Sequence, residues 1–149
     1  MTTVDDERAV LRVVDDLFVL TDRKDWAGVR ALFADGPVDV DMSSLAGDGP
    51  VAITADVLIA GFTVGLHANK RSHHMTTNAR VTFVDDTALA TAHGYAWNML
   101  VGRADLWETW GAYTLKLKRQ NDCWKIAAFR YDARANRGDD TIRTHTERP

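Results

Sequence analysis

Apolar residues recur at helical spacing in three segments of the N-terminal half of the chain. Residues 5–22 carry the strongest apolar stripe, and acidic residues occupy its first turn, where they favour a helix start. A second helix is predicted over 26–33, ended by a Gly-Pro pair, and a third over about 53–68. Because only a few residues separate the first two helices, we expect them to pack as a hairpin.

The second half of the chain alternates between apolar and polar residues, as β-strands do. Turn-forming residues separate four long predicted strands. These strands cover about 72–84, 87–101, 105–119 and 123–134. A shorter strand is predicted at 38–42, with a loop over 43–50, and the polar segment 136–149 is expected to be mobile. Three helices followed by an antiparallel meander predict one α+β domain over residues 1–149, in which helices cover one face of a curved sheet.

Composition narrows the class of protein. The chain has 149 residues, of which 46% are hydrophobic and 26% charged, and a net charge of −3, as in globular proteins. We expect no nucleic-acid partner, since no basic excess is present to neutralise phosphates. No apolar stretch is long enough for a membrane span, and the acidic N-terminus does not resemble a signal peptide. Cys123 is the single cysteine, so a reducing, cytoplasmic location is expected.

Apolar residues occur on both faces of the strand predicted at 72–84. His74, Thr76 and Asn78 share one face, whereas Val81 and Phe83 lie on the opposite face, together with His73. Either the outer face of the sheet is buried in a homodimer, or a β-bulge reverses the facing of the side chains. We expect a homodimer, because the helices of one chain suffice to cover only one face.

Three features together resemble a known family. They are Asp22 near the end of the first helix, the segment His74-Met75-Thr76-Thr77-Asn78, and Trp124-Lys125-Ile126 in the last strand. With the order of helices and strands, they resemble the SnoaL-like branch of the nuclear transport factor 2-like superfamily over about residues 5–134. The resemblance implies a cone-shaped α+β barrel around one ligand pocket. Relatives include scytalone dehydratase, hexachlorocyclohexane dehydrochlorinase, polyketide cyclases and ketosteroid isomerase.

The resemblance implies that Asp22 orients His74 as a catalytic base. An imidazole titrates near neutral pH and can accept a proton, while a carboxylate on its other nitrogen fixes the tautomer and stabilises the imidazolium. Alternatively, Asp22 ends its helix and pairs with Arg23 or Lys24 at the surface. His73 competes with His74 for the pocket, and the His-x-x-x-Asn spacing of the family selects His74 and Asn78.

The hairpin turn at residues 85–86 predicts which side chains accompany His74. It places Asn78 opposite about His93, and His74 opposite about Trp97, within one residue. The residues predicted to bind substrate are Asn78, His93, Tyr95, Trp97, Trp110 and Arg130. Arg130 enters through the resemblance, because an arginine of this strand holds the leaving group in the dehydrochlorinase-like relative; a surface ion pair is its alternative. Trp107, Trp110 and Tyr113 fit either a core or a pocket role.

The sequence contains no recognisable motif for binding a metal ion or a phosphate-containing cofactor. The adjacent His73 and His74 point to opposite faces and cannot share a metal ion, and Gly47-Asp48-Gly49-Pro50 lacks the lysine of a phosphate loop. We therefore expect a cofactor-independent lyase or isomerase, of the dehydratase or cyclase kind, acting on an apolar, aromatic or polyketide-like small molecule. The alternatives are a non-catalytic small-molecule-binding or association module, and an enzyme whose base is a carboxylate, as in ketosteroid isomerase.

Overall fold

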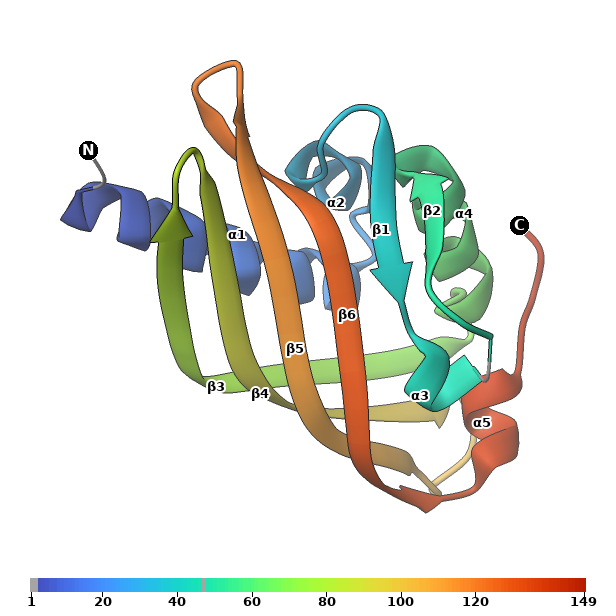
Figure 1. Ribbon diagram of the computed structural model, residues 1–149. Coiled ribbons are helices and arrows are strands. Elements are labelled where there is room, and N and C mark those ends of the chain that lie inside the picture. The colour runs from blue at the N-terminus through green and yellow to red at the C-terminus, as the bar shows by residue number, and fades with distance from the viewer. Residues whose placement is uncertain (1–2, 47) are drawn as a thin grey trace.

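A computed structural model describes residues 3–46 and 48–149 of the chain. It contains five helices and six strands (Figure 1). The helices are α1 (Val4–Arg23), α2 (Trp26–Leu32), α3 (Ser43–Ala46), α4 (Ala55–Gly65) and α5 (Asp140–Thr144). The strands are β1 (Pro37–Asp41), β2 (Val51–Thr54), β3 (Lys70–Val84), β4 (Thr87–Leu100), β5 (Trp107–Gln120) and β6 (Cys123–Gly138).

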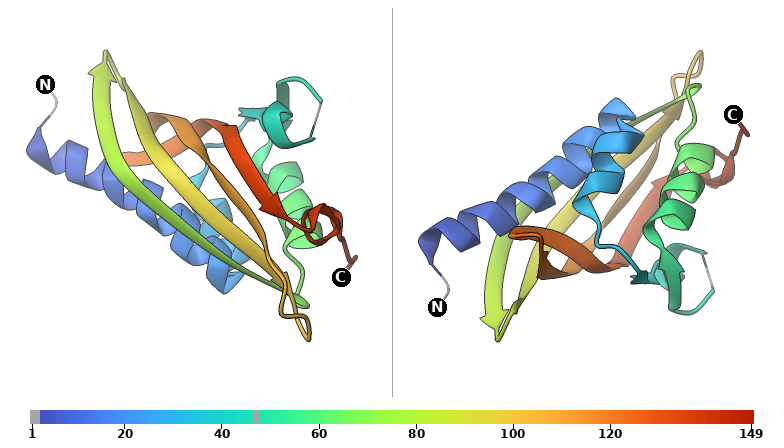
Figure 2. Two further views of the ribbon diagram at one scale, coloured as in Figure 1. Left: turned by 90° about the horizontal axis from the view of Figure 1, so that it is seen from below. Right: turned by 90° about the horizontal axis from the view of Figure 1, so that it is seen from above.

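The strands form one mixed sheet in the order β2-β1-β6-β5-β4-β3. β1 runs parallel to β6, and the other neighbouring strands are antiparallel. The sheet is strongly curved but not closed, and α1, α2 and α4 lie on its concave side (Figure 2). The predicted α+β fold with helices on one face of a curved sheet is confirmed, as a cone with an open edge rather than a closed barrel.

Helix α1 lies across the concave face and carries Asp22 at its C-terminal end. A capping box between Thr3 and Asp6 starts the helix, and Lys24 ends it in the left-handed conformation, with φ of 57°. Its apolar stripe packs on the sheet through the buried residues Val10, Val14, Leu17 and Phe18. Among the described residues, no helix is long and apolar enough to cross a membrane.

A β-bulge in β3 reverses the facing of its side chains. Thr77 pairs with His93 but Arg80 pairs with Thr91, so Asn78 and Ala79 stand opposite a single residue of β4. Asn78 has a positive φ of 56°, which asparagine tolerates better than most residues. Because of the bulge, residues at even-numbered positions face inwards before it and residues at odd-numbered positions face inwards after it. A β-bulge is one of the two explanations that the sequence left open for apolar residues on both faces of this strand.

Two segments differ from the sequence-based expectation. The expected loop over 43–50 contains α3, and the start of the expected third helix is β2, because elements of four residues are too short to show a period. The segment 136–149 is not a free tail. β6 continues to Gly138, and α5 buries Ile142 completely against the rest of the protein. The burial of Ile142 thus helps to attach this polar segment.

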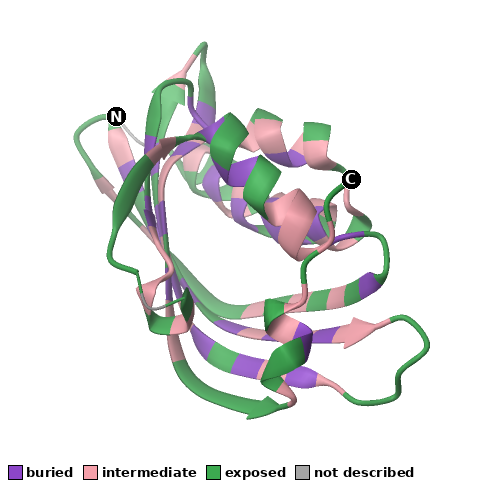
Figure 3. Ribbon diagram, turned by 90° about the vertical axis from the view of Figure 1, so that its right-hand side faces the viewer, coloured by how far each residue is buried: buried purple, intermediate pink, exposed green. Residues whose placement is uncertain are grey.

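Burial alternates along the strands (Figure 3). On β4 the buried residues include Ala88, Ala90, Ala92, Ala96 and Asn98, whereas Leu89 and His93 are exposed. The even-numbered positions of β4 therefore face the helices, and the odd-numbered positions face outwards. This alternation decides which predicted site residues can reach a ligand inside the cone.

Candidate active site

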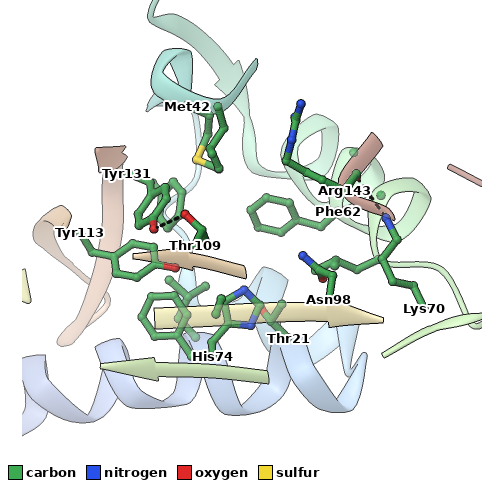
Figure 4. Close-up of a pocket in the computed structure, with 18 of the residues that line it drawn as sticks. Thr21, Met42, Phe62, Lys70, His74, Asn98, Thr109, Tyr113, Tyr131 and Arg143 are labelled. Atoms are coloured by element: carbon green, nitrogen blue, oxygen red, sulfur yellow. Dashed lines mark hydrogen bonds between the residues drawn. The ribbon is translucent and has the colours of Figure 1, made fainter. Parts of the chain in front are cut away.

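A cavity of about 210 Å³ lies between the helices and the concave face of the sheet (Figure 4). Its wall is mainly apolar, with a few polar groups at defined points. The lining residues include Leu17, Phe18, Thr21, Met42, Leu45, Phe62, Leu66, Lys70, His74, Ala96, Asn98, Trp107, Thr109, Tyr113, Phe129, Tyr131 and Arg143. A concave, apolar site with few polar groups is typical of small-molecule binding. Among the described residues that line it, none is an aspartate or a glutamate.

Asp22 and His74 are joined directly at this cavity. The Nδ1 atom of His74 lies 2.6 Å from Oδ1 of Asp22, and the backbone N–H of His74 donates to Oδ2 at 2.7 Å. The hydroxyl of Ser72 donates to Oδ1 at 2.8 Å. The expected contact between the two side chains is confirmed. Three donors from β3 hold the carboxylate at the end of α1 and thereby fix where the imidazole lies.

The hydrogen bonds to Asp22 determine its charge and the tautomer of His74. Burial alone raises the pKa of Asp22, but hydrogen bonds from His74 and Ser72 and the charge of the imidazole outweigh it, so the pKa lies below its usual value. An ionised carboxylate can only accept, so Nδ1 of His74 donates. In the neutral imidazole Nε2 then carries the lone pair, and it has no hydrogen-bond partner within residues 3–46 and 48–149.

His73 occupies the opposite face of β3. Its side chain is 53% exposed, compared with 16% for His74, and its Nδ1 lies 3.9 Å from the Asp22 carboxylate. The His74 ring stacks on Phe18 with the ring centres 5.7 Å apart. Of the two adjacent histidines, His74 is the one that lines the cavity.

Two tyrosines, one from β5 and one from β6, line the cavity. The ring of Tyr113 lies 4.5 Å from that of Phe18 and 4.6 Å from that of Tyr131. The backbone leaves room for Tyr113 because position 94 is glycine: a Cβ there would lie 2.2 Å from the Tyr113 ring. Burial raises the pKa of the Tyr113 hydroxyl, as does the neighbourhood of Tyr131 and Asp22, so this hydroxyl stays protonated.

Lys70 connects the cavity wall to the C-terminal segment. Its side chain is completely buried, and its ammonium donates to the backbone carbonyls of Arg143 at 3.2 Å and His145 at 2.7 Å. Burial, together with the positive charges of Arg143 and Lys24, lowers the pKa of Lys70 to about 8. These hydrogen bonds hold the end of α5 at the cavity, where Arg143 forms part of the lining. No pattern in the sequence assigns Lys70 to the site, since it precedes the strand predicted from residue 72.

The predicted substrate-binding residues on β4 lie outside the cavity. His93, Tyr95 and Trp97 occupy odd-numbered positions of β4 and face outwards. The Tyr95 hydroxyl donates to Glu108 at 2.7 Å, and the Trp97 ring lies 6.0 Å from that of His73. The bulge at residues 78–79 is the reason for the difference. His74 pairs with Ala96 and not with Trp97, and this shift of one residue exchanges the two faces of β4.

The other three residues that were predicted to bind substrate also lie on the outer surface. Asn78 sits at the exposed bulge with its Nδ2 3.1 Å from Nδ1 of His93, and Trp110 is 36% exposed. The Arg130 side chain is 55% exposed and pairs with Asp132 at 2.9 Å, which is the surface ion pair left open as its alternative. On β5 and β6 the cavity is lined instead by sequence neighbours of Trp110 and Arg130, namely Thr109, Phe129 and Tyr131.

One cluster of described residues has side chains close enough to share a metal ion: His67, His145 and Glu147. Nε2 of His67 lies 2.9 Å from Nδ1 of His145, and the backbone N–H of Asn69 donates to Nδ1 of His67 at 3.2 Å. Both nitrogens of His67 are therefore engaged within the protein. Burial lowers the pKa of His67, the carboxylate of Glu147 opposes this effect, and the charges of nearby Lys70 and Lys24 lower the pKa further and disfavour a bound cation. The arrangement fits a hydrogen-bonded attachment of the C-terminal segment.

The model of the SnoaL-like domain matches residues 2–130, which is most of the chain. The chain belongs to the SnoaL-like family. The matched segment runs from α1 to Arg130 in β6 and includes most of the residues that line the cavity, and the SnoaL-like resemblance of the sequence is thereby confirmed. No protein of curated function matches the chain.

Solved structures share the fold of this SnoaL-like protein. A protein from Kribbella flavida is 22% identical, with 89% of this chain and 93% of that chain covered, at a TM-score of 0.82. A hexachlorocyclohexane dehydrochlorinase from Novosphingobium barchaimii is 16% identical, with 98% and 97% covered, at 0.75. A candidate scytalone dehydratase from Novosphingobium aromaticivorans is 16% identical, with 91% and 89% covered, at 0.73. The TM-scores show a common fold, and at identities this low the similarity shows the fold alone.

Proposed function

We propose that this SnoaL-like protein is a cofactor-independent lyase or isomerase, of the dehydratase or cyclase kind, that acts on an apolar cyclic small molecule. The observation that carries the proposal is the Asp22–His74 pair at the wall of an apolar cavity, with Nε2 of His74 free to accept a proton. The names of similar structures, a dehydrochlorinase and a candidate dehydratase, support the reaction class.

In the proposed reaction, Nε2 of His74 takes a proton from a carbon atom of the substrate. The electron pair of the broken C–H bond forms a new double bond, and a leaving group departs with its own electron pair in an elimination. The imidazolium that results is stabilised by the ionised Asp22, which accepts the Nδ1–H. The apolar wall excludes water, and this strengthens the interaction between the two charges.

A carboxylate base is less well supported than His74. The lining residues include no aspartate or glutamate among those described, and Asp22 already accepts hydrogen bonds from Ser72 and His74. A non-catalytic binding module would use the same cavity but would show no turnover. Turnover separates the binding module from both kinds of enzyme, and the effect of His74→Gln on turnover separates a histidine base from a carboxylate base.

The reaction class can be tested with a panel of cyclic alcohols and cyclic halides. We expect the protein to release water or hydrogen halide from at least one member, detected by mass spectrometry, and to do so equally after dialysis against a chelator. Turnover that requires an added metal ion or cofactor would contradict cofactor independence. Binding without turnover across the panel would favour the binding module.

We also expect a homodimer that buries the outer face of the sheet. On this face Met75 is 55% exposed, Leu89 42% and Trp110 36%. Large apolar side chains exposed together on one face indicate a surface that another protein chain covers. Sedimentation at micromolar concentration should therefore give a dimer, and Trp110→Glu should shift it towards a monomer of 16.6 kDa. Val57→Glu, at an exposed position of α4, is the matched control and should leave association unchanged. A wild-type monomer would rule out this interface.

A further inference from the structure

Asn98 is an anomaly in the hydrogen bonding of the cavity wall. Several polar groups of the wall have partners in the protein: Lys70 donates to two carbonyls, and the hydroxyls of Thr109 and Tyr131 lie 2.8 Å apart. Among the described residues, Oδ1 of Asn98 alone is fully buried without a hydrogen-bond partner. A buried amide oxygen without a donor destabilises the folded protein, so such groups call for a partner from elsewhere.

Asn98 lies on the same face of the sheet as His74, a short distance along the neighbouring strand. Ala96 pairs with His74 across the sheet, and Asn98 follows two residues later on the same face of β4. Two residues of a strand span about 7 Å, which is about the width of a ring and its substituent. The side chain of Asn98 is among those that line the cavity (Figure 4). Rotation about χ2 of asparagine is soft, so the carboxamide can turn its oxygen towards a ligand.

We propose that Asn98 is the residue that selects the ligand, by accepting a hydrogen bond from a ligand hydroxyl. The preferred ligand is then a hydroxylated carbocycle, with its hydroxyl across the ring from the carbon that faces His74. This inference rests on the proposed function, because it takes the same cavity as the substrate site. A ligand with only a carbonyl at that point cannot satisfy Oδ1, since a carbonyl donates no hydrogen bond.

The size and chemistry of the cavity agree with this ligand class. An apolar cavity of about 150 Å³ is enough to bind benzene in another protein. The cavity here, at about 210 Å³, therefore suits one ring or two fused rings. Its wall includes hydrocarbon side chains such as Phe62 and Leu66, which suit the ring.

The inference is tested by binding, without need of turnover. Titration calorimetry would compare 2-naphthol with 2-methylnaphthalene, which share a ring system but differ in the hydroxyl. We expect wild type to prefer 2-naphthol, and Asn98→Leu to reduce this preference by about tenfold, because the hydroxyl then lacks an acceptor. Asn98→Ala should reduce it as well and serves if the leucine variant fails to fold. A wild type without preference, or an unchanged preference in the variants, would overturn the inference.

Thermal stability gives an independent readout. Asn98→Leu should melt at or above the wild-type temperature, because it replaces an unpaired buried amide with an apolar side chain of similar size. If an ordered water satisfies Asn98 in place of a ligand, the same variant should melt lower and keep the ligand preference, and the inference fails. His74→Gln separates the two proposals. We expect it to keep the preference for 2-naphthol, and loss of the preference there but not in Asn98→Leu would assign the hydroxyl to His74 instead.

Discussion

His74→Gln is expected to lower turnover by about 10² or more while changing ligand binding little. Glutamine keeps a polar side chain of similar length but cannot act as a base, so proton transfer is lost and most of the cavity remains. Steady-state kinetics would give the turnover, and titration calorimetry would give the affinity. Comparison of both quantities is needed, since a purely structural defect would weaken binding together with turnover.

His73→Gln is the matched control for this variant. It makes the same substitution one residue away, on the outer face of β3, where the side chain is 53% exposed. Turnover should stay near that of wild type. If His74→Gln also retains wild-type turnover, His74 is not the base. If wild type shows only binding, and His74→Gln weakens it by about 0.5–1.5 kcal/mol, the histidine acts as a hydrogen-bond partner in a binding module.

Asp22→Asn should lower turnover by a similar factor, about 10²–10⁴. The substitution removes the negative charge that stabilises the imidazolium. It also brings an amide N–H into a site that accepts three hydrogen bonds from Ser72 and His74. One orientation of the amide would donate to Nδ1 of His74 and hold the tautomer whose Nε2 cannot accept a proton. The measurement is the turnover number at a temperature where circular dichroism shows both proteins folded.

Asp15→Asn controls for loss of a carboxylate from the same helix. Asp15 lies on the exposed side of α1, away from the cavity, and its substitution should leave turnover unchanged. Wild-type turnover in Asp22→Asn would mean that the contact between Asp22 and His74 serves only to attach α1 to β3. Equal losses in both variants would indicate a general effect on the helix.

The periodicity of the sequence was enough to predict the main elements of the fold. Helices α1 and α2 and the four long strands have strong apolar periods, and all lie close to the predicted ranges. The short elements α3 and β2 have no period to detect. The segment 136–149 was misjudged because composition cannot show that Ile142 is buried or that Lys70 binds the carbonyls of Arg143 and His145.

The site was predictable in part. The contact of Asp22 with His74 followed from the family resemblance, because each residue lies at a fixed place in a helix or strand. The residues around them were not predictable from the hairpin turn alone, because one extra residue at the bulge reverses the facing of β4 relative to His74. A signal was present in β4 itself. Its even-numbered positions run Ala88, Ala90, Ala92, Gly94, Ala96, and small residues on one face indicate where helices and a ligand approach closely.

The central claim is that His74 removes a carbon-bound proton from a ligand in the cavity. Deuterium exchange tests it most directly. A panel of cyclic ketones and hydroxylated carbocycles would be incubated with the protein in D₂O, and proton NMR would follow the C–H signal next to the oxygen-bearing carbon. We predict that wild type and His73→Gln accelerate loss of this signal for at least one ligand, and that His74→Gln does so at least about 10² times more slowly. Equal exchange with His74→Gln and wild type would contradict the assignment of His74 as the base.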